Sequence, residues 1–294
     1  MLKYFDTPTT KIQSKELEYE GVRILVKRED LNHPYVSGNK WWKLKYNLEV
    51  AKRTGQDTIL TFGGAFSNHI YATAAAAKEL NFRSIGVIRG EEVLPLNSTL
   101  AFAMECGMKL HFISRDDYRR KNDESFIEKL KERFGDFIAI PEGGSNSLAL
   151  KGCAEFTLEK LSLIGFDYLC LPIGTGGTMA GIIQGLKGKR NVMGFSALKN
   201  GDFLKDEVRR LQQEYSAKVY DNWTIQTDFH FGGYARQTPE LNQLIERMKR
   251  LFDLPLDPIY TGKMVAGVFA MIEKNLFPKG STILILHTGG LRQH

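Results

Sequence analysis

A lysine at the start of an expected helix is the first residue whose surroundings suit chemistry. Lys40 directly follows the turn Ser37-Gly38-Asn39. The helical pattern behind it carries three apolar side chains inward: Leu44, Leu48 and Ala51. A lysine that forms a Schiff base needs a pKa about 3 units below the reference value of roughly 10.4. Desolvation, the helix N-terminus and the neighbours Trp41, Trp42 and Lys43 could lower it, although the same pattern also fits an ordinary exposed helix start.

A glycine-rich turn follows a later strand pattern and has the features of an anion site. Its residues are Gly174-Thr175-Gly176-Gly177-Thr178, and an apolar helix pattern begins directly after them. The glycines let successive N–H groups point inward, the two threonines add hydroxyl donors, and a helix N-terminus favours a phosphate. The segment is not a P-loop, because no Lys-Ser/Thr pair follows. A tight strand-to-helix turn without a ligand is the alternative.

A second turn of this kind, Gly63-Gly64-Ala65-Phe66, ends in three polar residues at the start of another expected helix. These are Ser67, Asn68 and His69, where a carboxylate would be well placed. The plainer alternative is that Ser67 or Asn68 caps the helix. His69 has no partner at the spacing of metal ligands, so we expect no metal site. Two further loops, Asp257 to Lys263 and His287 to Gly290, lie at helix or strand ends, where open α/β sheets bind ligands.

Strand-sized apolar runs that alternate with helical patterns must position these turns. The first set predicts strands at 58–62, 84–88, 109–113 and 137–140, with helices at 68–80, 96–106, 125–134 and 149–163. A second set predicts strands at 168–172, 192–196 and 282–286, with helices at 178–186 and 203–215. A hairpin-like start is expected over 17–30. This order predicts an α/β protein with parallel sheets covered by helices, divided near residue 150.

Composition excludes several classes of protein. The 294 residues are 43% hydrophobic and 25% charged, which is typical of a globular chain that can fold without metal or disulfide support. The 40 basic and 34 acidic residues are intermixed, and the short run Arg119-Arg120-Lys121 follows two aspartates, so no nucleic-acid surface is expected. Three widely spaced cysteines and the lack of a signal or membrane segment favour a cytoplasmic protein.

Seven motifs together carry a family resemblance across almost the whole chain. They are SGNKWWK, GGAFSNH, PEGGSNSLALKG, PIGTGGTMAG, FGGYA, DPIYTGK and HTGG, in order along the sequence. In order and approximate spacing they resemble the 1-aminocyclopropane-1-carboxylate deaminase and D-cysteine desulfhydrase family. These are tryptophan-synthase β-subunit-like enzymes that use pyridoxal 5′-phosphate (PLP). The resemblance implies the type II fold of PLP enzymes, with two open, twisted, mostly parallel sheets and the cofactor in the cleft between two domains. The larger domain would comprise residues 1–42 and 153–294, and the smaller one 43–152.

The resemblance also implies roles for individual residues. Lys40 would bond PLP covalently and then act as a base, while Lys43 and residues Gly174, Thr175, Gly176, Gly177 and Thr178 would hold its phosphate. Asn68 would bond the phenolic oxygen, and Thr261 would lie opposite the pyridine nitrogen. Ser67, Asn68 and His69 would bind the substrate carboxylate, Thr288 would line the substrate site, and Tyr234 and Tyr260 would face the substrate. Trp42 stands where the family commonly has arginine, which puts any role of that arginine in doubt. A homodimer is expected from the family alone.

The expected reaction is β-elimination or deamination of a small amino acid, with D-cysteine converted to pyruvate, ammonia and sulfide. The alternatives are ring opening of 1-aminocyclopropane-1-carboxylate and ammonia-lyase action on D-serine or a β-substituted D-alanine. The ring-opening enzymes carry glutamate where Thr261 stands and leucine where Thr288 stands, which favours D-cysteine. A nicotinamide-dependent oxidoreductase fits less well, because the turn at 174–178 lacks GxGxxG spacing. A non-catalytic PLP or amino-acid binder would leave Lys40 unexplained.

Overall fold

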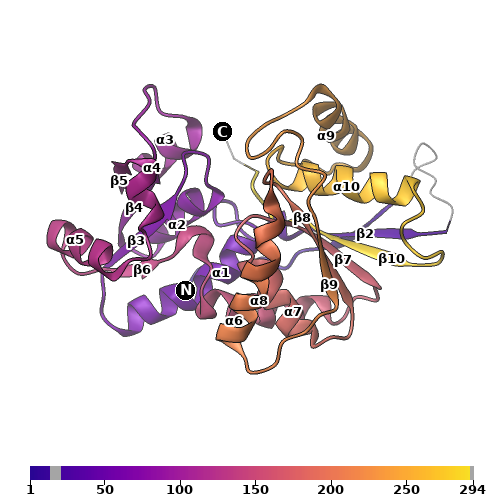
Figure 1. The fold of residues 1–294 in the computed structure, drawn as a ribbon, viewed down its shortest axis with the longest axis horizontal. Helices are drawn as coiled ribbons and strands as arrows, with labels where there is room; N and C mark the ends of the chain where they lie inside the picture. The colour runs from indigo at the N-terminus through magenta and orange to yellow at the C-terminus, as the bar shows by residue number, and fades with distance from the viewer. Residues whose placement is uncertain (14–20, 292–294) are drawn as a thin grey trace.

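The computed structural model describes residues 1–13 and 21–291, which form two sheets, each covered by helices on both faces (Figure 1). The strands are β1 (Thr9–Ile12), β2 (Arg23–Lys27), β3 (Thr58–Gly63), β4 (Arg83–Arg89), β5 (Met108–Ile113), β6 (Ile138–Ile140), β7 (Tyr168–Ile173), β8 (Asn191–Ser196), β9 (Trp223–Gln226) and β10 (Thr282–Leu286). The α-helices are α1 (Asn39–Arg53), α2 (Asn68–Glu79), α3 (Ser98–Glu105), α4 (Arg115–Arg119), α5 (Glu124–Phe134), α6 (Ser147–Phe156), α7 (Gly177–Leu186), α8 (Leu204–Tyr215), α9 (Pro239–Phe252) and α10 (Thr261–Glu273). None of these helices is long and apolar enough to cross a membrane.

The larger sheet has six strands in the order β1-β2-β10-β7-β8-β9. Only the edge pair β1 and β2 is antiparallel, and every other pair is parallel. The central strands β7 and β10 are almost wholly buried, as expected when helices cover both faces of a parallel sheet. The first strands of the chain therefore belong to the same sheet as its last strand.

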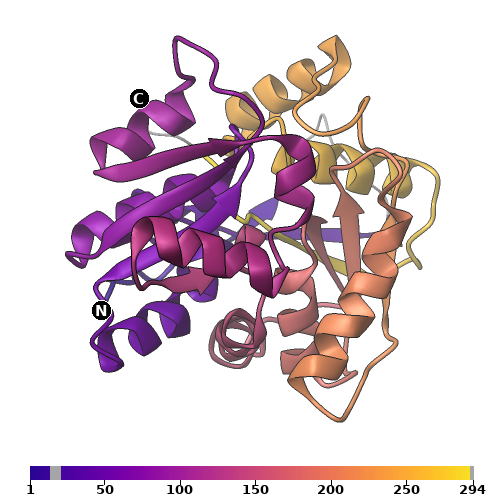
Figure 2. The same cartoon turned by 60° about the vertical axis from the view of Figure 1, so that its left-hand side comes forward.

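The smaller sheet has four parallel strands in the order β5-β4-β3-β6. One face packs against α2 and α3, around Ile70 and Leu100, and the other packs against α4 and α5, around Tyr118 and Leu130. Figure 2 brings this sheet forward and shows it beside the larger sheet, on the opposite side of the molecule from α9 and α10.

Helix α1 lies between the two sheets and joins their cores. It packs against α6, which in turn packs against α7. The largest cluster of buried apolar side chains runs from Ile59 and Ile140 of the smaller sheet, through Leu44 and Leu48 of α1, to the larger sheet. A separate cluster lies between the other face of the larger sheet and α9 and α10. Lys40 thus stands at the start of a helix that is fixed from both sides.

The sequence predicted the α/β class correctly, and the strands predicted from residue 58 onward agree with the structure to within about two residues at each end. The hairpin expected over 17–30 lies partly outside the described residues, and the antiparallel partner of β2 is the earlier strand β1. The helix expected over 149–163 is not continuous. It ends at Phe156 and is followed by a π-helical turn, Thr157–Leu161. Strand β9 and helices α4 and α9 were not predicted.

Candidate active site

The start of α1 is wedged against the end of β10. A Cβ added to Gly38, whose φ is +69°, would lie 1.9 Å from the carbonyl oxygen of Thr288. The backbone N–H of Asn39 donates to that same oxygen at 3.3 Å. Only glycine permits so close an approach in this conformation. Lys40 is therefore placed directly beside the loop that follows the last strand.

Lys40 lies in an environment that makes its amine less basic. Burial lowers the pKa of Lys40 to about 8, although the neighbouring Cys153 and Asp257 act in the opposite direction. A buried amine loses hydration that stabilises its charged form. A substantial fraction of Lys40 is consequently neutral near pH 8, as a nucleophile or a base requires.

Lys40 and two other predicted site residues line one small cavity of about 20 Å³. Asn68 comes from the start of α2 and Thr288 from the loop after β10, and Ser37 and Gly290 complete this part of the wall. A Cβ on Gly290 would lie 2.7 Å from Nδ2 of Asn68. Residues more than two hundred positions apart in sequence therefore meet at the Lys40 amine.

The turn at 174–178 forms one side of a cationic cradle. Lys43, 1% exposed, donates from Nζ to Oγ of Ser145 at 3.0 Å, and this oxygen lies 2.7 Å from Oγ1 of Thr175. A Cβ added to Gly177 would lie 2.6 Å from Oγ of Ser145 and 3.0 Å from Nζ of Lys43. Burial, followed by repulsion from Lys40, lowers the pKa of Lys43 to about 7. Because Gly177 has no side chain, there is space directly in front of the Lys43 amine.

This cradle fits a phosphate group. Among the described residues, no carboxylate lies within 4 Å of Nζ of Lys43, and the backbone N–H groups of Thr175 and Gly176 donate to no protein acceptor. Helix α7 begins at Gly177 and directs its N-terminus at the same space. A dianion placed there would satisfy the free N–H groups and restore the charged form of Lys43. Thr178 is also held in place, because Nδ2 of Asn39 donates to its Oγ1 at 2.8 Å.

The three polar residues at the start of α2 have different surroundings. Ser67 is the N-cap, and its Oγ accepts from the backbone N–H groups of His69 and Ile70. The His69 ring is buried, with Nε2 2.8 Å from Oγ1 of Thr61, while its Nδ1 has no hydrogen-bond partner among the described residues. Burial and the nearby Lys40 and Lys43 hold the pKa of His69 well below its usual range. The side chain that reaches the Lys40 cavity is that of Asn68.

Thr261 is fully buried and its hydroxyl is held by a carboxylate that the sequence analysis did not single out. Oγ1 of Thr261 donates to Oδ2 of Asp257 at 2.6 Å and accepts from the backbone N–H of Asp257 at 2.9 Å. The same carboxylate accepts three backbone N–H groups, those of Ile259, Tyr260 and Thr261. Asp257 therefore fixes the start of α10, and its carboxylate accepts the hydrogen bond that the Thr261 hydroxyl donates.

Two tyrosines lie near the glycine-rich turn, since a Cβ added to Gly174 would stand 3.2 Å from Cε1 of Tyr260. The rings of Tyr234 and Tyr260 lie 6.0 Å apart at 67°. Oη of Tyr234 donates to the carbonyl oxygen of Phe66 at 3.3 Å, which links the loop before α9 to the loop before α2. Burial, with Tyr234 nearby, raises the pKa of Tyr260 well above its usual value, so this phenol stays neutral.

A buried lysine from α10 holds the loop that carries Tyr234. Nζ of Lys263 donates to the carbonyl oxygens of His230 at 2.9 Å and Gly233 at 2.7 Å. The loop needs such support because Phe231 and Ala235, neither of them glycine, have φ values of +49° and +57°. Sequence reasoning missed this contact because nothing local to Lys263 indicates which loop it reaches.

Replacing Lys263 with methionine should loosen this loop without opening a large cavity. Methionine has a stem of similar length, but it donates no hydrogen bonds. Two charge-assisted bonds worth about 1.5–3 kcal/mol each would be lost. We expect amide exchange at residues 230–235 to become at least about tenfold faster in hydrogen–deuterium exchange. The matched control is Lys274→Met at the exposed end of α10, and equal exchange in the two variants would contradict this role.

Trp42, which replaces the family's usual arginine, bonds to a buried acid. Its Nε1 donates to Oε2 of Glu29 at 2.8 Å. Three more side chains donate to the same carboxylate: Tyr4, Thr7 and Asn32. Trp42 therefore ties α1 to the segment after β2. Across residues 1–13 and 21–291, no group of His, Cys, Asp and Glu side chains is arranged to hold a metal ion.

Comparison with known proteins gives a consistent result. The family model described as "Pyridoxal-phosphate dependent enzyme" matches residues 2–289. A putative 1-aminocyclopropane-1-carboxylate deaminase from Thermotoga maritima is 34% identical, with 97% of this chain and 94% of the relative covered. The mitochondrial bifunctional D-cysteine desulfhydrase/1-aminocyclopropane-1-carboxylate deaminase of Arabidopsis thaliana is 33% identical, covering 92% of this chain and 73% of that enzyme. A D-cysteine desulfhydrase from Yersinia pestis is 27% identical over 97% of this chain and 91% of its own.

Solved structures agree in fold. The crystal structure of an ACC deaminase homologue superposes with a TM-score of 0.85 and 28% identity, covering 99% of this chain and 91% of that chain. The processed threonine deaminase isoform 2 from Solanum lycopersicum, at 16% identity and a TM-score of 0.67, is similar in fold alone, with 93% of this chain and 76% of that chain covered.

Proposed function

Since this chain belongs to the family of pyridoxal-phosphate dependent enzymes, we propose that it catalyses β-elimination on a small amino acid and that D-cysteine is its preferred substrate. D-cysteine and water would give pyruvate, ammonia and sulfide. The observation that carries the choice of substrate is Thr261, whose neutral hydroxyl stands where the resemblance places a glutamate in ring-opening enzymes and donates its proton to Asp257.

The cofactor, when bound, delocalises the electron pair released at the substrate α-carbon. We assign its phosphate to Lys43, Ser145 and residues 174–178, because these groups converge on a space that lacks a counter-charge. We assign covalent attachment to Lys40. Its amine, freed when substrate arrives, would take the α-proton at Nζ, and a pKa of about 8 suits that exchange near neutral pH.

The remaining residues would orient the substrate and exclude water. Asn68 reaches the Lys40 cavity and would bond the cofactor's phenolic oxygen. Ser67 and His69 at the start of α2 would join it in binding the substrate carboxylate, with His69 neutral. Tyr260 and Tyr234 would cover the opposite side, since their rings lie 6.0 Å apart and Tyr234 is also bonded to Phe66 in the loop before α2.

Thr261 and Thr288 separate D-cysteine elimination from ring opening. A carboxylate at position 261 would favour the protonated, strongly electron-withdrawing pyridine that a substrate without an α-hydrogen needs. D-cysteine has an ordinary α-hydrogen and a good thiolate leaving group, so a weaker electron sink suffices. Ring opening of 1-aminocyclopropane-1-carboxylate and elimination from D-serine or another β-substituted D-alanine are the alternatives. Relatives are named for D-cysteine desulfhydrase and for 1-aminocyclopropane-1-carboxylate deaminase.

Steady-state kinetics test this proposal. We expect kcat/KM for D-cysteine, followed by release of pyruvate and sulfide, to exceed kcat/KM for 1-aminocyclopropane-1-carboxylate by at least about tenfold, a difference of about 1.4 kcal/mol in the barrier. The Lys40→Ala protein, purified in the same way, controls for contaminating activity. A higher value for ring opening would refute the argument from Thr261 and Thr288.

The quaternary and domain organisation are part of the same proposal. We assign residues 1–42 and 153–294 to a larger domain and 43–152 to a smaller one, which is supported by the membership of β1, β2 and β7–β10 in one sheet. A homodimer and a cytoplasmic location would fit the family resemblance. Three free cysteines, Cys106, Cys153 and Cys170, also fit a reducing compartment.

A further inference from the structure

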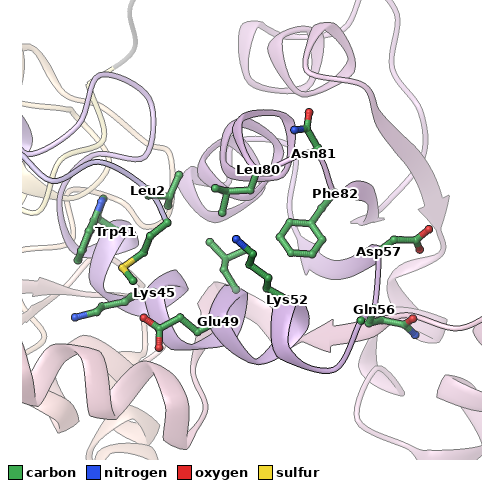
Figure 3. Close-up of a pocket in the computed structure, with 13 residues that line it drawn as sticks. Leu2, Trp41, Lys45, Glu49, Lys52, Gln56, Asp57, Leu80, Asn81 and Phe82 are labelled. Atoms are coloured by element: carbon green, nitrogen blue, oxygen red, sulfur yellow. The ribbon is translucent and has the colours of Figure 1, made fainter.

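A second cavity lies away from the Lys40 site, on another side of α1. Its volume is about 370 Å³, against about 20 Å³ for the cavity at Lys40. It lies between α1, the end of α2 and the segment before β3 (Figure 3). Volumes of this size are typical of sites for small molecules.

The wall of this cavity is mainly apolar. Trp41 and Leu48 from α1 face Leu80 and Phe82 from the α2–β4 connection, and Leu2 closes one end. In Figure 3 the side chain of Phe82 points into the centre of the space. An apolar side chain of a ligand would bury its surface here, gaining about 25 cal/mol for each Å² removed from water.

The charged groups around the cavity divide into paired and unpaired ones. Lys45 is paired with Glu155 at 2.7 Å, and Asp57 is paired with Arg83 at 2.7 Å. Glu49 and Lys52 also line the cavity, but within the described part of the chain neither has an ion-pair partner within 4 Å.

These two groups have opposite charge and lie one turn apart on α1, at positions 49 and 52. Figure 3 shows Lys52 extending up between Leu80 and Phe82, while Glu49 lies below, toward Lys45. Among the described residues, the charged side chains at this wall without an ion-pair partner are therefore one cation, the exposed Lys52, and one anion, the half-buried Glu49, around an apolar interior. This combination matches a molecule with a carboxylate, an ammonium group and an apolar side chain.

We propose that this cavity is a binding site for an apolar α-amino acid, with its carboxylate at Lys52, its ammonium group at Glu49 and its side chain against Leu48, Leu80 and Phe82. The ligand would touch the same helix whose first turn carries Lys40, but it would not share the Lys40 cavity. Trp41 lines the site and is one of three tryptophans in the chain, so its fluorescence reports occupancy.

The chemical class is tested with the holoenzyme and L-leucine as the probe. Calorimetric titration, with tryptophan fluorescence as a second readout, should show saturable binding of L-leucine. Three analogues each lack one group of L-leucine: 4-methylpentanoate lacks the ammonium group, 3-methylbutylamine lacks the carboxylate and glycine lacks the side chain. Each should bind about tenfold more weakly or worse than L-leucine. That loss corresponds to one charge-assisted bond or to a buried butyl group.

A pair of charge-reversal variants tests the location. Lys52→Glu should weaken L-leucine binding by about tenfold, while Arg53→Glu, the next residue on the same helix but outside the cavity, should bind as the wild type does. Both variants should retain wild-type kcat/KM for D-cysteine, which separates this site from the Lys40 site. Undiminished L-leucine binding in Lys52→Glu would overturn the proposal.

Two other outcomes would also overturn it. Absence of saturable binding of L-leucine at millimolar concentration would exclude the amino-acid class. A second copy of the chain is the other possible occupant. If sedimentation shows a dimer that dissociates on Phe82→Glu while L-leucine does not bind the wild type, the cavity belongs to a subunit interface.

Discussion

The Lys40→Ala enzyme is expected to lose about 10³-fold or more in kcat/KM for D-cysteine, because in our proposal one amine would both attach the cofactor and carry the α-proton. The wild-type holoenzyme, reduced with borohydride and digested, should yield a pyridoxyl peptide that contains Lys40. The variant should give no such peptide, although Lys43 and the glycine-rich turn should still hold the cofactor without a covalent bond. Circular dichroism should show the same fold in both proteins.

The control is Lys151→Ala, which removes an exposed lysine from α6. It should retain wild-type activity and labelling. Recovery of the pyridoxyl group on Lys43 or Lys263 would show that Lys40 is not the attachment residue. The closeness of Lys43 makes the mapping necessary, because the two amines are near enough for Lys40 to lower the pKa of Lys43.

The Gly177→Val enzyme should bind PLP about 10- to 100-fold more weakly than the wild type. Its Cβ would stand 2.6 Å from Oγ of Ser145 and 3.0 Å from Nζ of Lys43, in the space that we assign to the phosphate. The loss corresponds to one charge-assisted hydrogen bond. Equilibrium dialysis of the apoenzyme against PLP measures the dissociation constant, and ³¹P NMR reports the phosphate environment.

The matched control for this variant is Gly165→Val. Among the described residues, and apart from its two chain neighbours, no atom lies within 4 Å of a Cβ at Gly165; its φ is not positive, so valine should fit there without strain. Thermal unfolding of both apoproteins separates loss of the cradle from loss of the fold. An unchanged dissociation constant in a folded Gly177→Val protein would place the phosphate elsewhere.

Sequence periodicity predicts strands and helices whose apolar residues form a regular pattern. It fails for elements whose conformation depends on contacts with other parts of the chain. Strands β3, β7 and β10 are mainly apolar runs that are almost wholly buried, so they are visible without a structure. Strand β9 has only four residues, and pairing with β8 defines it. Helix α9 is a different case, because Thr238 and Pro239 form a helix start that is visible in the sequence.

The site residues also fall into two groups, those that local sequence motifs reveal and those that only the fold reveals. Lys40, Gly177 and Asn68 lie in the first turns of helices, directly after loops whose local motifs point to chemistry. Ser145, Asp257 and Lys263 are held by contacts with residues of other segments or by capping geometry, so their surroundings appear only once the chain is folded. The motif DPIYTGK contains both Asp257 and Lys263, yet the sequence does not show that one caps α10 while the other supports the Tyr234 loop.

The wedge between Gly38 and Thr288 has a consequence for biosynthesis. The ribosome makes Lys40 early, but the carbonyl oxygen that stands against its helix start belongs to a residue made about 250 positions later. At roughly 5–20 residues per second, that interval lasts on the order of 10–50 seconds. The smaller sheet, complete at β6, can form during this time, whereas Lys40 receives its final surroundings only after β10 has been translated. If Lys40 holds the cofactor as we propose, cofactor capture is a late event in the life of each new chain, because a nascent chain that stalls before β10 would lack the burial that lowers the pKa of Lys40.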